Sequence, residues 1–123
     1  MNLRTIRLEL ARNAEFPEGS AQHGYEFVAP LDAADRIDLE AWRQHRERCV
    51  VRRFWAGEDD LRGHLAHSQG RRWLFHYDLE AAAEATADEP GYRFEAHAFR
   101  PGEYASITEA DGVTRTFKVV SVR

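Results

Sequence analysis

Cysteine and long apolar runs are scarce in this sequence of 123 residues. Its single cysteine, Cys49, excludes an internal disulfide and is typical of proteins from a reducing compartment. No apolar run approaches the roughly 20 residues that are needed to cross a membrane. The segment from Met1 to Leu10 alternates charged and apolar residues and lacks the continuous apolar core of a signal peptide. We therefore expect a cytoplasmic protein without a membrane partner.

Lysine is almost absent, because Lys118 stands against sixteen arginines. The net charge is −4, yet residues 41–77 hold eight basic and four acidic groups, and all eight cations are arginine. Arginine binds carboxylates and phosphates through two parallel hydrogen bonds, but a compositional bias toward arginine explains this island more simply. Nucleic-acid binding through the cation–aromatic runs at 52–55 and 71–73 is a second alternative function. The negative net charge argues against it.

Motifs of known catalytic chemistry are also missing. The chain has no phosphate-binding loop, dinucleotide fingerprint or paired-cysteine motif. Ser106 has no nucleophile elbow around it. Cys49 follows the C-terminal end of a predicted helix, where the helix dipole raises the pKa of a thiol, so a buried and inert cysteine is the better interpretation. We assign no catalytic residue and no cofactor, and a binding or interaction module is favoured over an enzyme.

The stretch from Gly91 to Val122 is the clearest structural pattern and predicts a β-meander. Strands are expected over 92–99, 103–109 and 113–122. A three-residue turn at 110–112 places Gly112 in the left-handed conformation that glycine adopts easily. In that register Ala105 faces Phe117 and Ile107 faces Arg115. A two-residue turn would move Ile107 to the other face, so the apolar pattern favours the longer loop.

The rest of the chain adds further strands and one helix. Period-two alternation predicts strands at 2–12, 25–31 and 50–56. Asp38 is the expected N-cap of a helix over 39–48, whose apolar residues Leu39 and Trp42 cover one end of the sheet. The composition, 43% hydrophobic and 31% charged, suits one soluble domain over 1–123. We predict a mainly β, single-domain antiparallel barrel or sandwich of about eight strands with one short helix.

A second hairpin, with a loop at Ser68-Gln69-Gly70, predicts a ligand site. In this register Leu65 faces Trp73, Gly63 faces Phe75 and Leu61 faces Tyr77. Residues three apart on a strand point to opposite sides, so His64 and His67 do not form a ligand pair. The face away from Trp73 instead carries Arg62, His64, Leu74 and His76, with His64 and His76 as diagonal neighbours. We expect a small anionic ligand to be bound by Arg62, His64, His76 and His97.

The same histidines support an alternative function, a metal-dependent enzyme or metal-binding protein. Zinc takes three or four ligands from histidine, cysteine and carboxylate side chains. Glu95 and His97 alternate on one face of their predicted strand and supply the missing ligands. If a metal is bound, its ligands are expected to be His64, His76, Glu95 and His97. The alternative in which these are ordinary surface histidines also stays open.

Four segments together resemble a family of small bacterial proteins of similar length and no established activity. They are His23-Gly24-Tyr25, Gly63-His64-Leu65, residues 73–78 and residues 97–104. The resemblance spans most of the chain and implies a bacterial, cytoplasmic origin and a compact β-rich fold, but no catalytic residue. A protein partner is a further expectation. An exposed strand edge, such as the one that ends at Pro30, would allow a homodimer.

Overall fold

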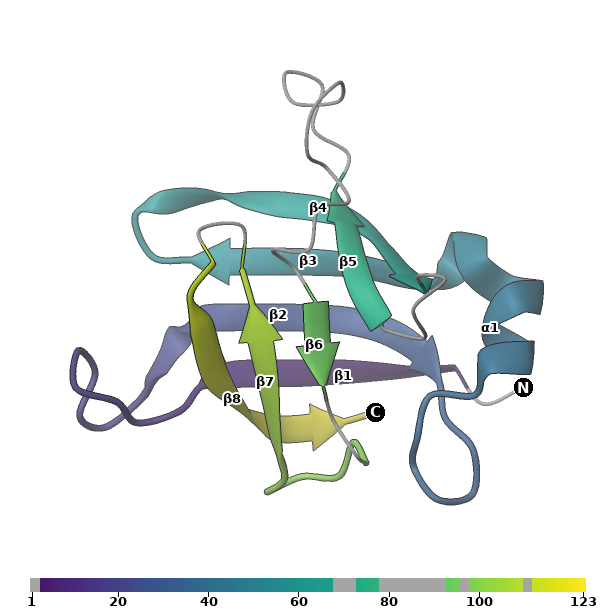
Figure 1. Cartoon of the computed structure of the whole chain (residues 1–123), viewed down its shortest axis with the longest axis horizontal. Coiled ribbons are helices and arrows are strands. Elements are labelled where there is room, and N and C mark those ends of the chain that lie inside the picture. Colours follow the sequence, from purple (N-terminus) through teal and green to yellow (C-terminus); the bar gives the residue numbers. More distant parts are fainter. Residues whose placement is uncertain (1–2, 68–72, 78–92, 96–97, 110–111) are drawn as a thin grey trace.

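The structure is a computed structural model, and it describes residues 3–67, 73–77, 93–95, 98–109 and 112–123. It is mainly β, with one short helix (Figure 1). The strands are β1 (Leu3–Leu10), β2 (Ser20–Pro30), β3 (Val50–Trp55), β4 (Glu58–His67), β5 (Trp73–Tyr77), β6 (Arg93–Glu95), β7 (Tyr104–Thr108) and β8 (Thr114–Val122). The helix α1 (Leu39–His45) continues into one 3₁₀ turn, η1 (Arg46–Arg48).

All strand pairs are antiparallel, and each strand pairs with the next one along the chain. β8 also pairs with β1, so the first and last strands lie side by side in one strongly curled sheet (Figure 1). Among the described residues, β6 forms two residue pairs with β5 and three with β7. The prediction of a mainly β antiparallel fold with one short helix is confirmed.

The first two strands follow from alternation and from one glycine. In β1 Ile6, Leu8 and Leu10 are buried, while Arg7 and Glu9 face outward. The second strand begins at Ser20, earlier than the predicted residue 25. The added part includes Gly24, where a Cβ atom would lie 2.0 Å from the Leu8 carbonyl oxygen. Glycine therefore allows the two backbones to approach closely at this point.

The helix closes one end of the sheet, as its apolar stripe predicts. The Asp38 carboxylate accepts a hydrogen bond from the Ala41 amide at 3.1 Å, which confirms the N-cap. Trp42 is buried and donates its indole N–H to the Leu65 carbonyl at 3.0 Å. The α-helix ends at His45, before the predicted residue 48, because the chain tightens into η1.

The β7–β8 hairpin has the predicted register. Ala105 pairs with Phe117 and Ile107 with Arg115. Gly112 has a φ of 81° and donates its amide to the Glu109 carbonyl. Val113 is 46% exposed because it lies in the turn before β8 begins. Residues 110–111 of the predicted turn lie outside the described residues.

Of the strand predicted over 92–99, the structure describes a ladder at Arg93–Glu95. Residues 92, 96 and 97 lie outside the described residues. Phe99 lies outside any strand, where its amide donates to the Asp35 carbonyl at 2.8 Å and its ring is buried. This contact joins the segment before β7 to the loop that follows β2.

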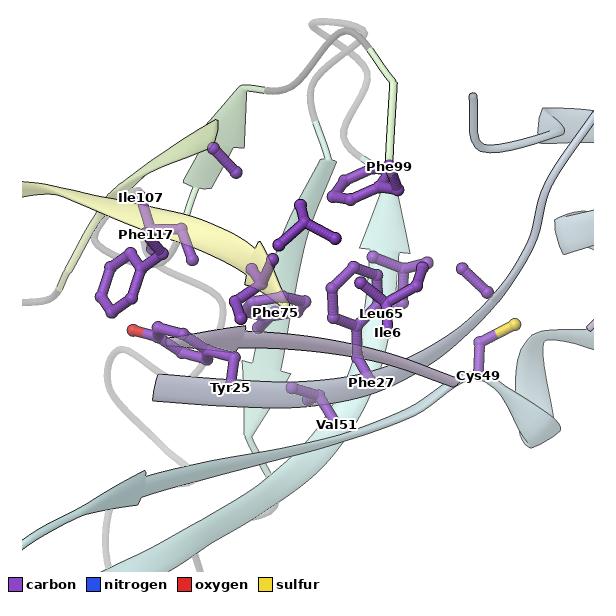
Figure 2. Packing of buried hydrophobic residues seen from close by; sticks show 14 of the residues in the cluster. Ile6, Tyr25, Phe27, Cys49, Val51, Leu65, Phe75, Phe99, Ile107 and Phe117 are labelled. Carbon is purple, nitrogen blue, oxygen red and sulfur yellow. The ribbon is translucent and has the colours of Figure 1, made fainter. Parts of the chain in front are cut away.

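Aromatic rings fill the space inside the curled sheet (Figure 2). The ring centroid of Tyr25 lies 5.2 Å from those of Phe75 and Phe117, and Phe27 lies 5.3 Å from Phe75. Such offset and edge contacts add to the free energy of burying the rings. Because these side chains occupy the interior, a ligand site is expected on the outer face or at the ends of the sheet.

Candidate functional site

The β4–β5 hairpin differs from the predicted register by two residues. His67 pairs with Trp73, Leu65 with Phe75 and Gly63 with Tyr77. A Cβ atom on Gly63 would lie 2.0 Å from the His76 carbonyl oxygen, so glycine is required where these strands approach. A shift of two leaves every side chain on its predicted face. The predicted loop 68–70 lies outside the described residues.

The new register brings the two predicted histidines closer together. His64 and His76 are directly opposite each other and not diagonal neighbours. Directly opposed residues in an antiparallel pair have Cβ atoms about 4.5–5.5 Å apart. Both histidines are half-buried, on the outer face of the sheet. Two imidazoles on adjacent strands can therefore meet one ligand from the same side.

A charged row crosses the outer face beside these histidines. Arg7 pairs with Glu26, Glu26 with Arg52, and Arg52 with Arg62. The carboxylate of Glu26 lies 3.8 Å from a guanidinium nitrogen of Arg7 and 3.6 Å from one of Arg52. Arg52 also donates to Asp60 at 3.1 Å. The row therefore ends in two cations side by side.

Arg62 differs from its neighbours in this row. It is exposed, and within the described part of the chain it forms no ion pair. In the β3–β4 ladder it pairs with Arg52, which carries the same charge. Like charges directly opposite each other destabilise a sheet. A bound anion would relieve this repulsion.

An open depression of about 340 Å³ lies at the end of this row. Arg62 and His64 line it on β4, as Glu26 and Arg52 do on the neighbouring strands. Its remaining side-chain lining is Thr5, Val28 and Val50. The structure thus places two of the four predicted ligand-binding residues in one depression and His76 directly beside it.

The other predicted ligands are not placed here. His97 lies outside the described residues. Glu95 pairs with Ser106 in the β6–β7 ladder, and its side chain is not described. Among the described residues, no group of three histidine, cysteine or acidic side chains is arranged to hold a metal ion. The predicted metal site is therefore represented here by His64 and His76 only.

A second charged cluster, which sequence analysis missed, lies inside the sheet. The Glu109 carboxylate accepts hydrogen bonds from Arg53 Nε at 2.8 Å and from Arg115 Nη1 at 2.6 Å. The Tyr25 hydroxyl also donates to Glu109. Arg53 reaches outward to Glu58 at 3.2 Å, where the cluster meets solvent. Arg53 and Glu109 are 56 positions apart in the chain, so no local pattern in the sequence predicts their contact.

Electrostatics show that this cluster satisfies its own charges. Burial raises the pKa of Tyr25 well above its usual value, and the neighbouring Tyr77 and Glu109 raise it further. Burial opposes the charge on Arg53, but its hydrogen bond with Glu109 and the nearby negative groups raise its pKa overall. The indole ring of Trp55 packs against both arginines. The guanidinium carbon of Arg53 lies 4.3 Å from the centroid of this ring. Among the described residues, the cluster thus pairs the buried Glu109 carboxylate with two arginines.

The arginine island is thus divided between structural and exposed groups. Arg53 and Arg52 are held by acidic side chains. Phe54 is buried under the guanidinium groups of Arg7, at 4.4 Å, and Arg52, at 5.0 Å. Arg71 and Arg72 lie outside the described residues. The aromatic rings at 54 and 55 are covered by protein groups, so this half of the island is poorly suited to stacking with bases.

Cys49 is fully buried beneath the helix, as predicted for an inert cysteine (Figure 2). Its thiol lies 3.4 Å from the His45 carbonyl oxygen. Burial raises the pKa of Cys49 to about 11. The thiol is therefore protonated at neutral pH and shielded from reagents, which argues against a nucleophile.

Comparisons with protein-family models, curated proteins and solved structures return no match for this chain. The resemblance to small bacterial proteins therefore stays a prediction. In the described part of the chain, no helix has the length and apolar character needed to span a membrane.

Proposed function

We propose that this protein is a binding module for a small anion, which it holds on the outer face of the sheet at Arg62, His64 and His76. The proposal takes the sheet as an eight-stranded barrel closed through β6, supported by the β5–β6 and β1–β8 pairing. We further propose that the protein is bacterial and cytoplasmic. The binding face belongs to the β3–β4–β5 part of the barrel.

One observation carries the proposal. Arg62 faces Arg52 directly across the ladder, and only Arg52 has acidic partners among the described residues. A strand register that sets two guanidinium groups side by side costs free energy unless an anion lies between or beside them. His64 lies two positions along β4, on the same face and in the same depression. Three nitrogen-bearing side chains thus lie together on one face of β4 and β5, beside the paired Arg52.

The same geometry makes an anion a better ligand than a metal. The direct opposition of His64 and His76 suits a divalent cation, which is the alternative function predicted from the sequence. However, Arg62 lies beside them, and a cation would add to its charge. Two histidines also leave most coordination positions open. An anion uses the arginine and both imidazoles together, since protonated imidazole is a donor at both nitrogens.

Anion binding is tested by titrating the ¹⁵N-labelled protein with inorganic phosphate at low ionic strength and pH 6. We expect saturable shifts of the amide signals in β4 and β5 around positions 62–64 and 76. Arg62→Gln and the double substitution of His64 and His76 by Gln should each weaken phosphate binding at least tenfold. Arg36→Gln and His45→Gln are matched controls, because these residues lie in the loop before α1 and in α1 itself.

Four results would count against the proposal. The absence of saturable shifts with phosphate would exclude the site. Equal weakening in the two control variants would show that the effect is general charge screening. Saturable shifts of the same signals with zinc chloride, but not with phosphate, would favour the metal-binding alternative. Binding of the protein to oligonucleotides, with an affinity that falls steeply as the salt concentration rises, would support the nucleic-acid alternative.

A further inference from the structure

We infer that the preferred ligand of this site is a carboxylate with an apolar body, and that the body lies across β3 and β2 toward β1. The inference rests on the proposed function, because it assumes that Arg62 and His64 hold an anionic group. It adds the chemical class of the ligand and its orientation. The observation behind it is the composition of the depression away from the basic residues.

Two rows of side chains run across the strands, side by side, on this face. One is the charged row that ends at Arg62. The other contains His76 and His64 and continues to Val50 on β3, which pairs with His64. On β1 and β2, Thr5 pairs with Val28. Because Phe27 pairs with Val51, Val28 and Val50 are the next residues in register across β2 and β3. The second row therefore contains His76, His64, Val50, Val28 and Thr5, and all of them except His76 line the depression.

The apolar part of this row is unusually accessible. Val50 is 45% exposed, and few other large apolar side chains among the described residues reach the surface to this extent. Val28 and Thr5 are half-buried beside it. The depression therefore has basic groups at its β4 end and aliphatic groups toward β1. A ligand that fills it must combine both characters, since inorganic phosphate leaves the valines uncovered.

The charges around the depression set the direction of the ligand. Glu26 lies on β2, beside the apolar end, and its carboxylate is 3.5 Å from a guanidinium nitrogen of Arg123 as well as near Arg7 and Arg52. The guanidinium groups there are already paired with the Glu26 carboxylate, so they attract a ligand carboxylate less than Arg62, which has no acidic partner among the described residues. At the β4 end the ligand carboxylate meets Arg62 and His64 instead. The apolar body then points from β4 toward Thr5.

The size of the depression limits the apolar body. Its volume of about 340 Å³ is near the lower end of pockets that hold small molecules. The row from β4 to β1 spans three strand spacings, or roughly 14 Å. A single ring or a short alkyl chain fits this space. A branched or polycyclic body would extend beyond it into solvent.

The test compares acetate with octanoate, because both carry the same carboxylate and only octanoate has an apolar body. Each is titrated into the ¹⁵N-labelled full chain at pH 6 and equal ionic strength. We expect both to shift the signals of β4, and octanoate to bind at least tenfold more tightly and to shift the signals of residues 28 and 50 as well. Burial of a few CH₂ groups is sufficient for this difference.

Val50→Thr tests the placement without disturbing the basic end. Threonine keeps the branched shape at this exposed position and replaces one methyl group by a hydroxyl. We expect the preference for octanoate over acetate to fall several-fold. Ala33→Thr, in the exposed loop after β2, is the control and should leave both ligands unaffected.

The outcomes separate the two proposals. If neither acetate nor phosphate binds, the proposed function fails and this inference fails with it. If phosphate and acetate bind but octanoate binds no better, the anion site stands and the apolar part of the inference is wrong. If octanoate is preferred but Val50→Thr does not reduce the preference, the body lies elsewhere and the orientation is wrong.

Discussion

Arg53 on β3 and Glu109 after β7 are joined inside the sheet by a hydrogen bond of 2.8 Å from Nε to the carboxylate. Their side chains are only 10% and 4% exposed. Arg115 holds the other oxygen of the same carboxylate at 2.6 Å. The first and second halves of the chain therefore meet at one buried carboxylate.

Replacement of Glu109 by Gln should destabilise the protein strongly. It removes the negative charge that the buried Arg53 and the half-buried Arg115 share. Loss of one partner of a buried ion pair costs about 3–5 kcal/mol. The free energy of unfolding from urea denaturation measures the change. Glu58→Gln is the matched control, because Glu58 also bonds Arg53 but is 59% exposed and should cost less than about 1 kcal/mol. Similar losses in both variants would contradict the assigned role of Glu109.

Tyr25→Phe tests the hydroxyl that donates to Glu109. Removal of this hydrogen bond to a charged group should cost about 1.5–3 kcal/mol at neutral pH. The pKa of Tyr25 is raised in the folded state, so the unfolded chain loses this proton first as the pH rises through 10. The stability contributed by the protonated hydroxyl is then lost. Stability should thus fall less steeply above pH 10 in Tyr25→Phe than in the native sequence. Parallel curves for the two proteins would show that Tyr25 is not responsible.

Cys49 should produce a similar effect at lower pH. Its thiol has an ordinary pKa of 9.0 and a folded pKa of about 11 because it is buried. Between these values the unfolded chain binds fewer protons than the folded one, so stability falls as the pH rises. Cys49→Ala and Cys49→Ser should both flatten the curve between pH 9 and pH 10. The native protein should also react slowly with iodoacetamide at pH 8 until it is denatured. Rapid alkylation of the folded protein would show that the thiol is accessible.

Gly63→Ala tests the close contact that determines the β4–β5 register. The added Cβ atom would lie 2.0 Å from the His76 carbonyl oxygen and 2.6 Å from the Tyr77 Cα atom, so the strands must separate. We expect a loss of about 1–3 kcal/mol or more. Ala66→Ser adds one atom at a half-buried position of the same strand and is the control. A stable Gly63→Ala variant with unchanged amide signals in β5 would contradict the described pairing of Gly63 with Tyr77.

Much of the fold follows from local patterns in the sequence. Alternation placed Ile6, Leu8 and Leu10 on the buried face of β1, because side chains on a strand have a period of two. Asp38 identified the start of α1 through its side-chain oxygen. Gly112 identified the β7–β8 turn, since only a few residues adopt a positive φ at low cost. In each case the deciding interaction lies within a few positions along the chain.

The register of β4 and β5 shows where such reasoning stops. Alternation determines only which face a side chain occupies, so two registers that differ by two residues place Leu65 and Phe75 on the buried face equally well. The contact of Gly63 with the backbone of β5 decides between them. The predicted diagonal pair of His64 and His76 was therefore wrong, although the shared face was predicted correctly.

Residue types and their order in this sequence determined the buried and exposed faces, the helix cap and the last hairpin, because each depends on neighbours along the chain. Tertiary structure alone decided that Arg53 is buried against Glu109 while Arg62 is exposed beside Arg52. Arginines nine positions apart in one basic island acquire opposite roles in this way. The reason is physical: the energy of a charge depends on the groups that surround it, and strands distant in sequence bring those groups together.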